Sequence, residues 1–326
     1  MGKLPFENIS RKIIIKRDVK TNENFEKRPE DRTINELINY GIINLNKASG
    51  PSSHQITDYV KKILNVSKAG HSGTLDPKVV GVLPIALEKA TRIVQVLLTS
   101  GKEYVCLMYL HKKISEKEIK NIFEEFSGEI KQIPPVRSAV KRQERKRNIY
   151  YIEILEIDDQ YILFRVGCQA GTYIRKLVDQ IGKKIGCGAH MVQLIRTKAG
   201  PFNDNEMYTL HDLKDAYEFY KEGSEKGIRK IILPFERAVD HLGKVWVVDG
   251  CVDALCHGAP LYIVGISKLT ENINKNDIVA VLTLKNELIC IGQAEIDSDE
   301  MVKLEKGVAV DKIKVFMERG TYRKTV

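Results

Sequence analysis

The sequence predicts an α+β domain built on a mixed, largely antiparallel sheet, followed by a small β-barrel. Strand-like and helix-like segments alternate over residues 41–200, and two strand-like segments flank Asp158-Asp159-Gln160, which indicates an antiparallel hairpin. After Pro234 the chain changes to short apolar runs with Gly and Asn-Asp breaks, as is typical of a small barrel. The expected parts are an N-terminal extension that packs on the C-terminal domain (residues 1–40), a central domain (41–235) and the barrel (236–326).

The hydrophobic pattern justifies each element in order. Residues 42–45 form an apolar run typical of a buried strand, and residues 53–64 carry apolar side chains at helical spacing. Residues 104–110 are apolar on both faces, as in a central strand. The other expected strands are residues 151–157 and 161–168, then 244–248, 261–266, 278–284, 288–296 and 308–316 in the barrel.

The composition bounds the class of protein. A chain of 326 residues with 43% apolar content can form two or more domains with sizeable cores. Its 52 basic and 43 acidic residues give a net charge of +9, which favours an anionic partner without identifying it. Because no apolar run reaches the roughly 18 residues that span a bilayer and no signal-peptide core is present, we expect a cytoplasmic protein. The six cysteines lack a C-x-x-C pair, which predicts reduced thiols, no zinc and no structural disulfide.

The most informative motif runs from Gly70 to Val80 and reads G-H-S-G-T-L-D-P-K-V-V. Gly73 permits backbone angles closed to other residues, and Pro77 favours an extended conformation for Asp76. The loop therefore presents one carboxylate. Taken alone, an Asp-Pro pair is also common in ordinary turns, where the carboxylate caps nearby amides.

Further motifs accompany this loop: Lys102-Glu103-Tyr104, the segment G-T-Y-I-R ending at Arg175, and the segment G-A-H-M-V-Q-L ending at Leu194. Together they resemble the TruB family of pseudouridine synthases. The resemblance is to its archaeal RNA-guided branch, the catalytic subunit of the H/ACA ribonucleoprotein, whose eukaryotic counterpart is dyskerin. It extends from about Asn44 to the C-terminus.

Three positions depart from the family pattern. Asn46 and Ala48 stand where Asp and Pro are usual, and Ile195 stands where the family commonly has a basic residue before Arg196. These positions lie beside the expected site. They therefore bear on substrate contacts more than on the chemistry.

The resemblance implies that the protein isomerises uridine to pseudouridine in RNA without a cofactor or metal. The reaction breaks the bond from ribose to uracil N1, turns the base and rejoins it through C5. Asp76 is the expected catalytic carboxylate, acting either by attack on C1′ (the acylal route) or by removal of the C2′ proton (the glycal route). The sequence leaves both routes open.

The resemblance also implies an ion pair between Asp76 and Arg175, since an opposite charge favours an ionised carboxylate. Arg175 lies on an expected helix from Thr172 and points away from its apolar stripe. From spacing alone, a surface pair with Asp179 at i+4 is the alternative.

The resemblance assigns three more residues to the pocket. Tyr104 would stack on the target uracil as a catalytic residue, Leu194 would close the pocket, and His71 would fill the space left by a flipped base. Each has a structural alternative. The tyrosine could be a packing residue of a strand, the leucine a core residue, and the histidine a hydrogen-bonded loop residue.

RNA contacts are expected from basic residues. Residues 137–147 contain six basic residues against one acid and resemble the family's mobile thumb loop, although such a run is often only a solvated loop. The expected substrate-binding residues are Arg137, Lys141, Arg142 and, from the family, Lys47. The segment Cys256-His257-Gly258-Ala259 and its position make the barrel resemble a PUA domain, which implies that Gly258 contacts guide RNA.

The sequence therefore predicts a pseudouridine synthase that acts on rRNA, and also on tRNA, within an H/ACA guide ribonucleoprotein. The implied partners are guide RNA, substrate RNA and the small protein subunits of that particle, with no membrane. One alternative is a stand-alone enzyme acting on the T-loop of tRNA. The other is a noncatalytic RNA-binding scaffold, whose mark would be loss of Asp76, Tyr104 or Arg175; all three are present. Target uridines and dependence on partners stay open.

Overall fold

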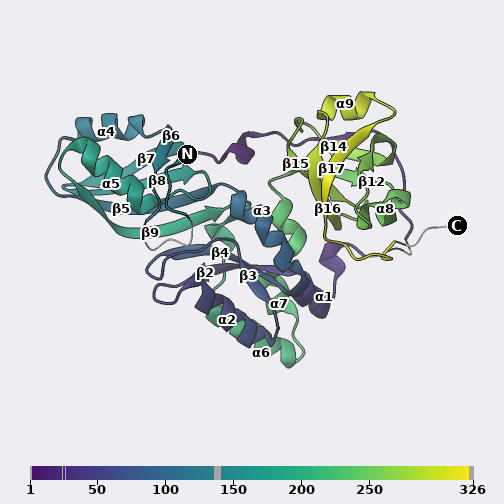
Figure 1. Ribbon diagram of the computed structural model, residues 1–326. Coiled ribbons are helices and arrows are strands. Elements are labelled where there is room, and N and C mark those ends of the chain that lie inside the picture. The colour runs from purple at the N-terminus through teal and green to yellow at the C-terminus, as the bar shows by residue number, and fades with distance from the viewer. Residues whose placement is uncertain (1, 24, 26, 136–140, 323–326) are drawn as a thin grey trace. The chain divides into compact units, whose positions relative to one another are not determined.

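The computed structural model describes residues 2–23, 25, 27–135 and 141–322. The chain forms two compact units, coloured by residue number in Figure 1. The first comprises residues 1–8 and 43–231, and the second comprises residues 9–42 and 232–326. None of the helices within the described residues is long and apolar enough to cross a membrane.

A mixed sheet forms the centre of the first unit. Its strands lie in the order β2 (Gly41–Lys47), β4 (Val80–Leu87), β9 (Ala189–Ala199), β5 (Lys102–Leu110), β8 (Tyr161–Cys168), β7 (Arg145–Asp158) and β6 (Gly128–Gln132). Strand β3 (Ala69–His71) pairs with β4, and β10 (Phe202–Asn203) pairs with β9. Strands β4 and β9 are parallel, whereas the pairs from β9 to β6 are antiparallel. The expected mixed, largely antiparallel sheet is confirmed.

Helices cover one face of this sheet. Helix α5 (Ile174–Ile185) packs on β9 and β5, and α4 (Glu116–Glu125) packs on β7 (Figure 1). The other helices of the unit are α2 (Ser53–Leu64), α3 (Val94–Thr99), α6 (Leu210–Lys221) and α7 (Lys226–Ile231). On β5 the side chains on one face, Cys106, Met108 and Leu110, are fully buried, whereas those on the other face, Val105, Leu107 and Tyr109, are only partly buried.

Local sequence signals explain where several elements begin and end. Helix α2 spans the residues expected from the hydrophobic pattern, because Ser52 and Gln55 form a capping box at its start and Asn65 adopts a left-handed conformation at its end. The hairpin between β7 and β8 turns at Asp159, which has a φ of 52°. The expected hairpin is therefore confirmed, with its first strand longer than the hydrophobic run indicated.

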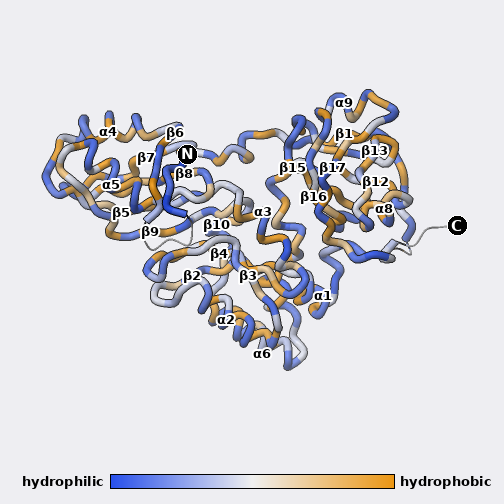
Figure 2. Tube along the Cα trace, viewed as in Figure 1, coloured by the Kyte–Doolittle hydropathy of each residue, from blue (hydrophilic) through white to orange (hydrophobic). Residues whose placement is uncertain are grey.

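A seven-stranded sheet forms the second unit, and its buried core includes Val245 and Val247 of β12; Figure 2 colours the chain by hydropathy. The order is β1 (Ile13–Ile15), β14 (Ile266–Thr270), β12 (Gly243–Val247), β15 (Ile278–Leu282), β16 (Leu288–Ala294), β17 (Val308–Val315) and β13 (Leu261–Tyr262). The expected single strand over residues 261–266 is wrong. A 3-10 turn at Ile263–Gly265 separates β13 from β14. Helices α8 (Val252–Cys256) and α9 (Ser298–Lys303) belong to this unit, whereas the short strand β11 (Ile232–Pro234) pairs with β2 at the end of the mixed sheet.

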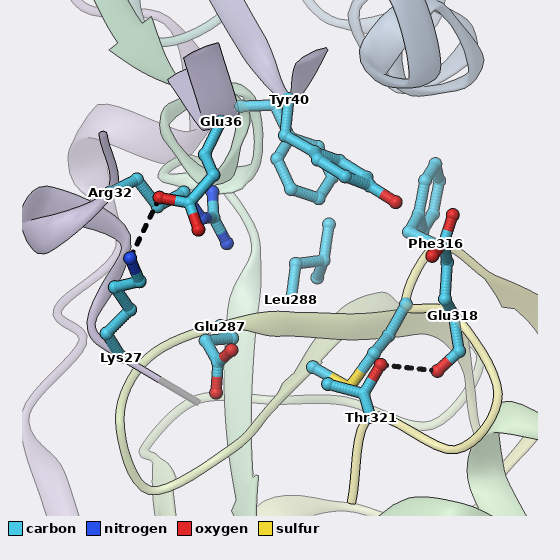
Figure 3. Close-up of a pocket in the computed structure, with 11 residues that line it drawn as sticks. Lys27, Arg32, Glu36, Tyr40, Glu287, Leu288, Phe316, Glu318 and Thr321 are labelled. Atoms are coloured by element: carbon cyan, nitrogen blue, oxygen red, sulfur yellow. Dashed lines mark hydrogen bonds and ion pairs between the residues drawn. The ribbon is translucent and has the colours of Figure 1, made fainter. Parts of the chain in front are cut away.

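Residues 9–42 are integrated into this second unit. Strand β1 pairs antiparallel with β14, and helix α1 (Ile34–Asn39) follows at the end of the segment. The Arg32 guanidinium donates two hydrogen bonds to the Glu236 carboxylate, at 2.8 and 2.7 Å. Figure 3 shows Arg32, Glu36 and Tyr40 from this segment around a pocket whose other side includes Leu288 and Phe316. A largely buried ion pair thus joins the N-terminal segment to the 3-10 helix Phe235–Val239.

This pairing predicts that Arg32→Ala will destabilise the protein on the order of 3 kcal/mol, because the largely buried Glu236 carboxylate loses its counter-charge. Thermal and denaturant unfolding of the full chain measure the loss. The control is Lys27→Ala, which removes an exposed pair with Glu36 and should cost less than about 1 kcal/mol. Equal losses in the two variants would contradict the prediction.

Candidate active site

The loop between β3 and β4 presents Asp76. The Ser53 hydroxyl interacts with both backbone groups of Leu75, accepting from its N–H at 2.8 Å and donating to its carbonyl at 3.1 Å. The Val79 N–H donates to the Asp76 carbonyl at 3.0 Å, and Gly73 has a φ of 126°. The backbone around Asp76 is therefore held by several bonds, whereas its carboxylate is 57% exposed. A substrate can reach it without rearrangement of the loop.

Two buried cations hold this loop. The Lys47 ammonium donates to the carbonyl oxygens of Ala48, Pro77 and Val79 at 3.0, 2.9 and 2.8 Å. The Arg196 guanidinium donates to the carbonyl oxygens of Val82 and Gly73, at 2.7 and 3.2 Å. Burial lowers the pKa of both cations, and nearby Asp76 opposes that shift at Lys47.

Lys47 was expected to contact an RNA phosphate, but the structure places its side chain in the interior. The side chain is fully buried, and its ammonium is bonded to three backbone carbonyls. It therefore cannot reach a phosphate in this structure. Its contacts make it a clamp on the Asp76 loop instead.

Arg175 lies beside Asp76, with 2.5 Å between Nη2 and Oδ2. It is the second residue of α5, whose apolar stripe faces inward, so that Ile174, Leu177, Val178 and Ile181 are buried. The alternative pair with Asp179 is not formed, because that carboxylate accepts from Lys183 at 3.0 Å. A guanidinium at the start of the helix thus faces the carboxylate of the loop.

Strands β5 and β9 bring two more side chains to the site, Tyr104 and Leu194. Tyr104 on β5 lies opposite Arg196 on β9, and Cys106 lies opposite Leu194. Leu194 is buried and Tyr104 is partly buried. Burial raises the pKa of the Tyr104 hydroxyl, while the adjacent Arg196 acts in the other direction. The tyrosine is therefore a neutral phenol next to a buried cation at pH 7.

His71 ends strand β3 at the start of the loop. Its ring packs edge-on against His54, with 4.9 Å between the ring centroids, and its Nδ1 accepts from the Gly73 N–H at 3.4 Å. Burial lowers its pKa, and the nearby His54 and Arg196 lower it further. A neutral imidazole thus forms one wall beside the loop.

The other residues expected to contact RNA are Arg137, Lys141, Arg142 and Gly258. Lys141 and Arg142 are exposed, while Arg137 lies outside the described residues. The basic run is only partly a loop, because Arg145–Asp158 is strand β7 and its first residues pair with β6. Gly258, in the second unit, follows α8 with a φ of 88° and is exposed.

Sequence reasoning named Arg196 only as a neighbour and missed its place in the site. Strand alternation could have identified it, because a residue two positions from Leu194 faces the same side. The same alternation places Ile195 on the opposite face, where it is 37% exposed. The departure at Ile195 therefore faces away from Leu194 and Arg196. At Ala48, the group that contacts Lys47 is the backbone carbonyl, which alanine supplies as well as proline does.

The arrangement joins an accessible carboxylate, a guanidinium paired with it and an aromatic ring beside a buried arginine. These groups can act on the sugar and base of a nucleotide. In the described part of the chain, no group of three or more His, Cys, Asp or Glu side chains has an arrangement that could hold a metal ion.

Protein-family models match almost the whole chain. They are the N-terminal domain of TruB family pseudouridylate synthases (residues 61–174), the C-terminal domain of tRNA pseudouridylate synthase B (175–255), the PUA domain (243–316) and the DKCLD (NUC011) domain (3–57).

Curated relatives are similar over their full length. A probable tRNA pseudouridine synthase B of Pyrococcus abyssi is 54% identical over 320 residues, which cover 97% of this chain and 96% of the relative. Its counterpart in Methanopyrus kandleri is 51% identical over 323 residues, which cover 99% and 95%. The likeness therefore extends to both units.

Solved structures are also similar to this chain over almost its whole length. The chain is 53% identical to one in a crystal structure of a Cbf5–Nop10–Gar1 complex, with a TM-score of 0.92 and 98% of each chain covered. For a structure of an H/ACA ribonucleoprotein bound to substrate RNA containing 2′-deoxyuridine, the identity is 51%, the TM-score 0.91 and the coverage 99% of each chain. With the site geometry and the curated relatives, these matches show that this chain belongs to the TruB family of pseudouridine synthases.

Proposed function

We propose that this chain is the catalytic subunit of an H/ACA guide ribonucleoprotein and that Asp76 is its catalytic carboxylate. The observation that carries the proposal is the ion pair of Asp76 with Arg175 on a loop fixed by buried Lys47 and Arg196. A fixed loop holds the carboxylate in one place while its exposed oxygens face a substrate. Family membership assigns the reaction, and this geometry supports the assignment of the residue.

The neighbouring side chains support a pocket for one uridine. A uridine in folded RNA must leave its stack before a protein side chain can reach its ribose, which costs a few kcal/mol. The Tyr104 ring offers a stacking surface for the extruded base, and Leu194 and His71 supply walls next to it. Arg175 compensates the Asp76 charge, either when the carboxylate attacks C1′ or when it removes the C2′ proton. Either route uses the carboxylate in its ionised form.

Contacts to RNA phosphates offset the cost of base extrusion. Lys141 and Arg142 are exposed, and with Arg137 they are the proposed substrate contacts of the first unit. Contacts of this kind strengthen binding without reading sequence. We assign the choice of uridine to guide RNA, and the exposed backbone at Gly258 in the second unit is a proposed contact to that RNA.

The guided assignment also includes protein partners of the kind named for the structural relatives, Nop10 and Gar1. It includes a cytoplasmic location, which the six free cysteines support. A stand-alone synthase acting on tRNA is the second candidate, because the curated relatives carry the name tRNA pseudouridine synthase B. The two candidates share the same active site and differ in what selects the uridine.

Asp76→Asn should abolish product formation, since the amide keeps the shape of the side chain but lacks its charge. The measurement is tritium release from RNA that carries 5-tritiated uridine, with guide RNA and the small H/ACA subunits present. The variant should still bind guide RNA with wild-type affinity. Tritium release at the wild-type rate would contradict the role of Asp76.

Arg175→Gln should slow single-turnover conversion by roughly 10² to 10³-fold, because the carboxylate loses the charge that faces it. The matched control is Lys183→Gln, which removes the pair with Asp179 further along the same helix. That control should stay within about twofold of wild type, as expected for an exposed helix pair. Equal rates in the two variants would contradict the proposed ion-pair role.

The choice between guided and stand-alone action is tested by leaving out the guide. Wild-type protein alone on tRNA and the assembled particle on a guide-matched RNA are compared by tritium release. If the enzyme is guided, the assembled particle should release no tritium from the guide-matched RNA when its guide is replaced by a mismatched one. Release that ignores the guide sequence would favour the stand-alone candidate.

A further inference from the structure

The pairing of β5 with β9 is irregular next to the active site. Lys102 lies opposite Ala199 and Glu103 opposite Lys198, but Tyr104 lies opposite Arg196. Thr197 is thus the extra residue of a β-bulge. Bulges of this kind redirect side chains and are common beside active sites.

The bulge decides which face of the sheet Arg196 occupies. In a regular strand, residues two apart share a face, so Arg196 would follow Lys198 to the face opposite Tyr104. The extra residue instead leaves both Thr197 and Lys198 on the face of Glu103. Arg196 is thereby returned to the side of Tyr104 and of the Asp76 loop, where its guanidinium is buried.

A buried carboxylate fastens the bulge from the reverse face. Glu103 is 2% exposed, and its Oε1 accepts from the Thr197 hydroxyl at 2.7 Å. Its Oε2 accepts from the Tyr151 hydroxyl and lies 3.8 Å from the Lys198 ammonium. Lys198 in turn pairs with Glu7 at 2.8 Å. Every oxygen of the buried carboxylate therefore has a partner, and one partner is the bulge residue itself.

These groups form one row across four strands. Tyr151 on β7 lies opposite Gly167 on β8, Gly167 lies opposite Glu103 on β5, and Glu103 lies opposite Lys198 on β9. A Cβ atom on Gly167 would lie 2.2 Å from the Tyr151 ring, so only glycine lets the ring cross the strand to reach Glu103. Burial and the bond to Glu103 raise the pKa of Tyr151, which keeps its hydroxyl a donor.

We propose that Glu103 is a positioning residue for pseudouridine formation: its carboxylate holds the bulge at Thr197 and so keeps Arg196 beside Tyr104 and the Asp76 loop. It acts through Thr197 and Arg196 and has no contact with the substrate. The inference rests on the proposed function of the site. It assigns a catalytic consequence to a network on the face of the sheet that carries no reacting group.

Thr197→Val and Thr197→Ser test this role. Valine has the shape of threonine without its hydroxyl, whereas serine keeps the hydroxyl. We expect Thr197→Val to lower the single-turnover rate about tenfold with RNA affinity unchanged, the effect of losing one hydrogen bond to a charged group. Thr197→Ser should restore the rate to within about threefold of wild type. Melting temperatures identify the conditions under which each variant is folded.

Two further variants keep the test decisive. Tyr151→Phe removes the second hydroxyl from Glu103 and should also lower the rate while RNA affinity stays constant. Lys120→Gln breaks an exposed pair with Glu116 on α4 and should leave the rate unchanged, because that pair is not part of the network around Glu103. Tyr151→Phe replaces the valine variant if the latter does not fold.

The outcomes separate the two claims. Suppose that the wild type is active and that all variants are folded at the assay temperature. If Thr197→Val and Tyr151→Phe then react at the wild-type rate, the positioning role of Glu103 is overturned and the proposed function stays intact. An inactive wild type in the assembled particle would overturn both. A lowered rate in Thr197→Val with recovery in Thr197→Ser supports the proposal.

Discussion

The Asp76 loop depends on two buried cations whose hydrogen-bond donors point at backbone carbonyls. Lys47 binds the carbonyls of Pro77 and Val79, and Arg196 binds those of Gly73 and Val82, so the loop is held both before and after Asp76. Buried charges are costly unless their donors are satisfied, and here carbonyl dipoles satisfy them. The exposed Asp76 carboxylate is consequently presented by a backbone that these hydrogen bonds hold. Its partner Arg175 comes from the start of a different element, α5, whose apolar stripe fixes the direction of the guanidinium.

The sheet divides this work between its two faces. On the helix-covered face, β5 and β9 place Tyr104, Leu194 and Arg196 together, where a base can stack and a loop can be held. On the other face, Glu103 gathers hydroxyls and an ammonium around the bulge at Thr197. A change of one residue in register would exchange these faces, so the bulge is where the fold and the chemistry are coupled.

Sequence patterns could predict features that depend on local spacing. Helix 53–64, the hairpin at Asp159 and the outward direction of Arg175 all follow from hydrophobic periodicity or turn chemistry. Alternation from Leu194 places Arg196 on the site's face, but the burial of Lys47 and the carbonyl contacts of Arg196 could not be predicted in this way, because they depend on which carbonyls distant segments bring within reach. The bulge at Thr197 could not be predicted from the alternation of apolar and polar residues either, because one extra residue reverses that alternation.

A crystal structure of the assembled particle, with an RNA that carries an unreactive uridine analogue at the target position, would test the role of Asp76 most directly. We expect an extruded nucleotide stacked on Tyr104, with its ribose C1′ or C2′ about 3 to 3.5 Å from the Asp76 carboxylate. Such a distance is expected for groups poised to react. A target nucleotide that stays in its RNA stack, or that binds with its ribose turned away from Asp76, would contradict the central claim that this carboxylate performs the reaction.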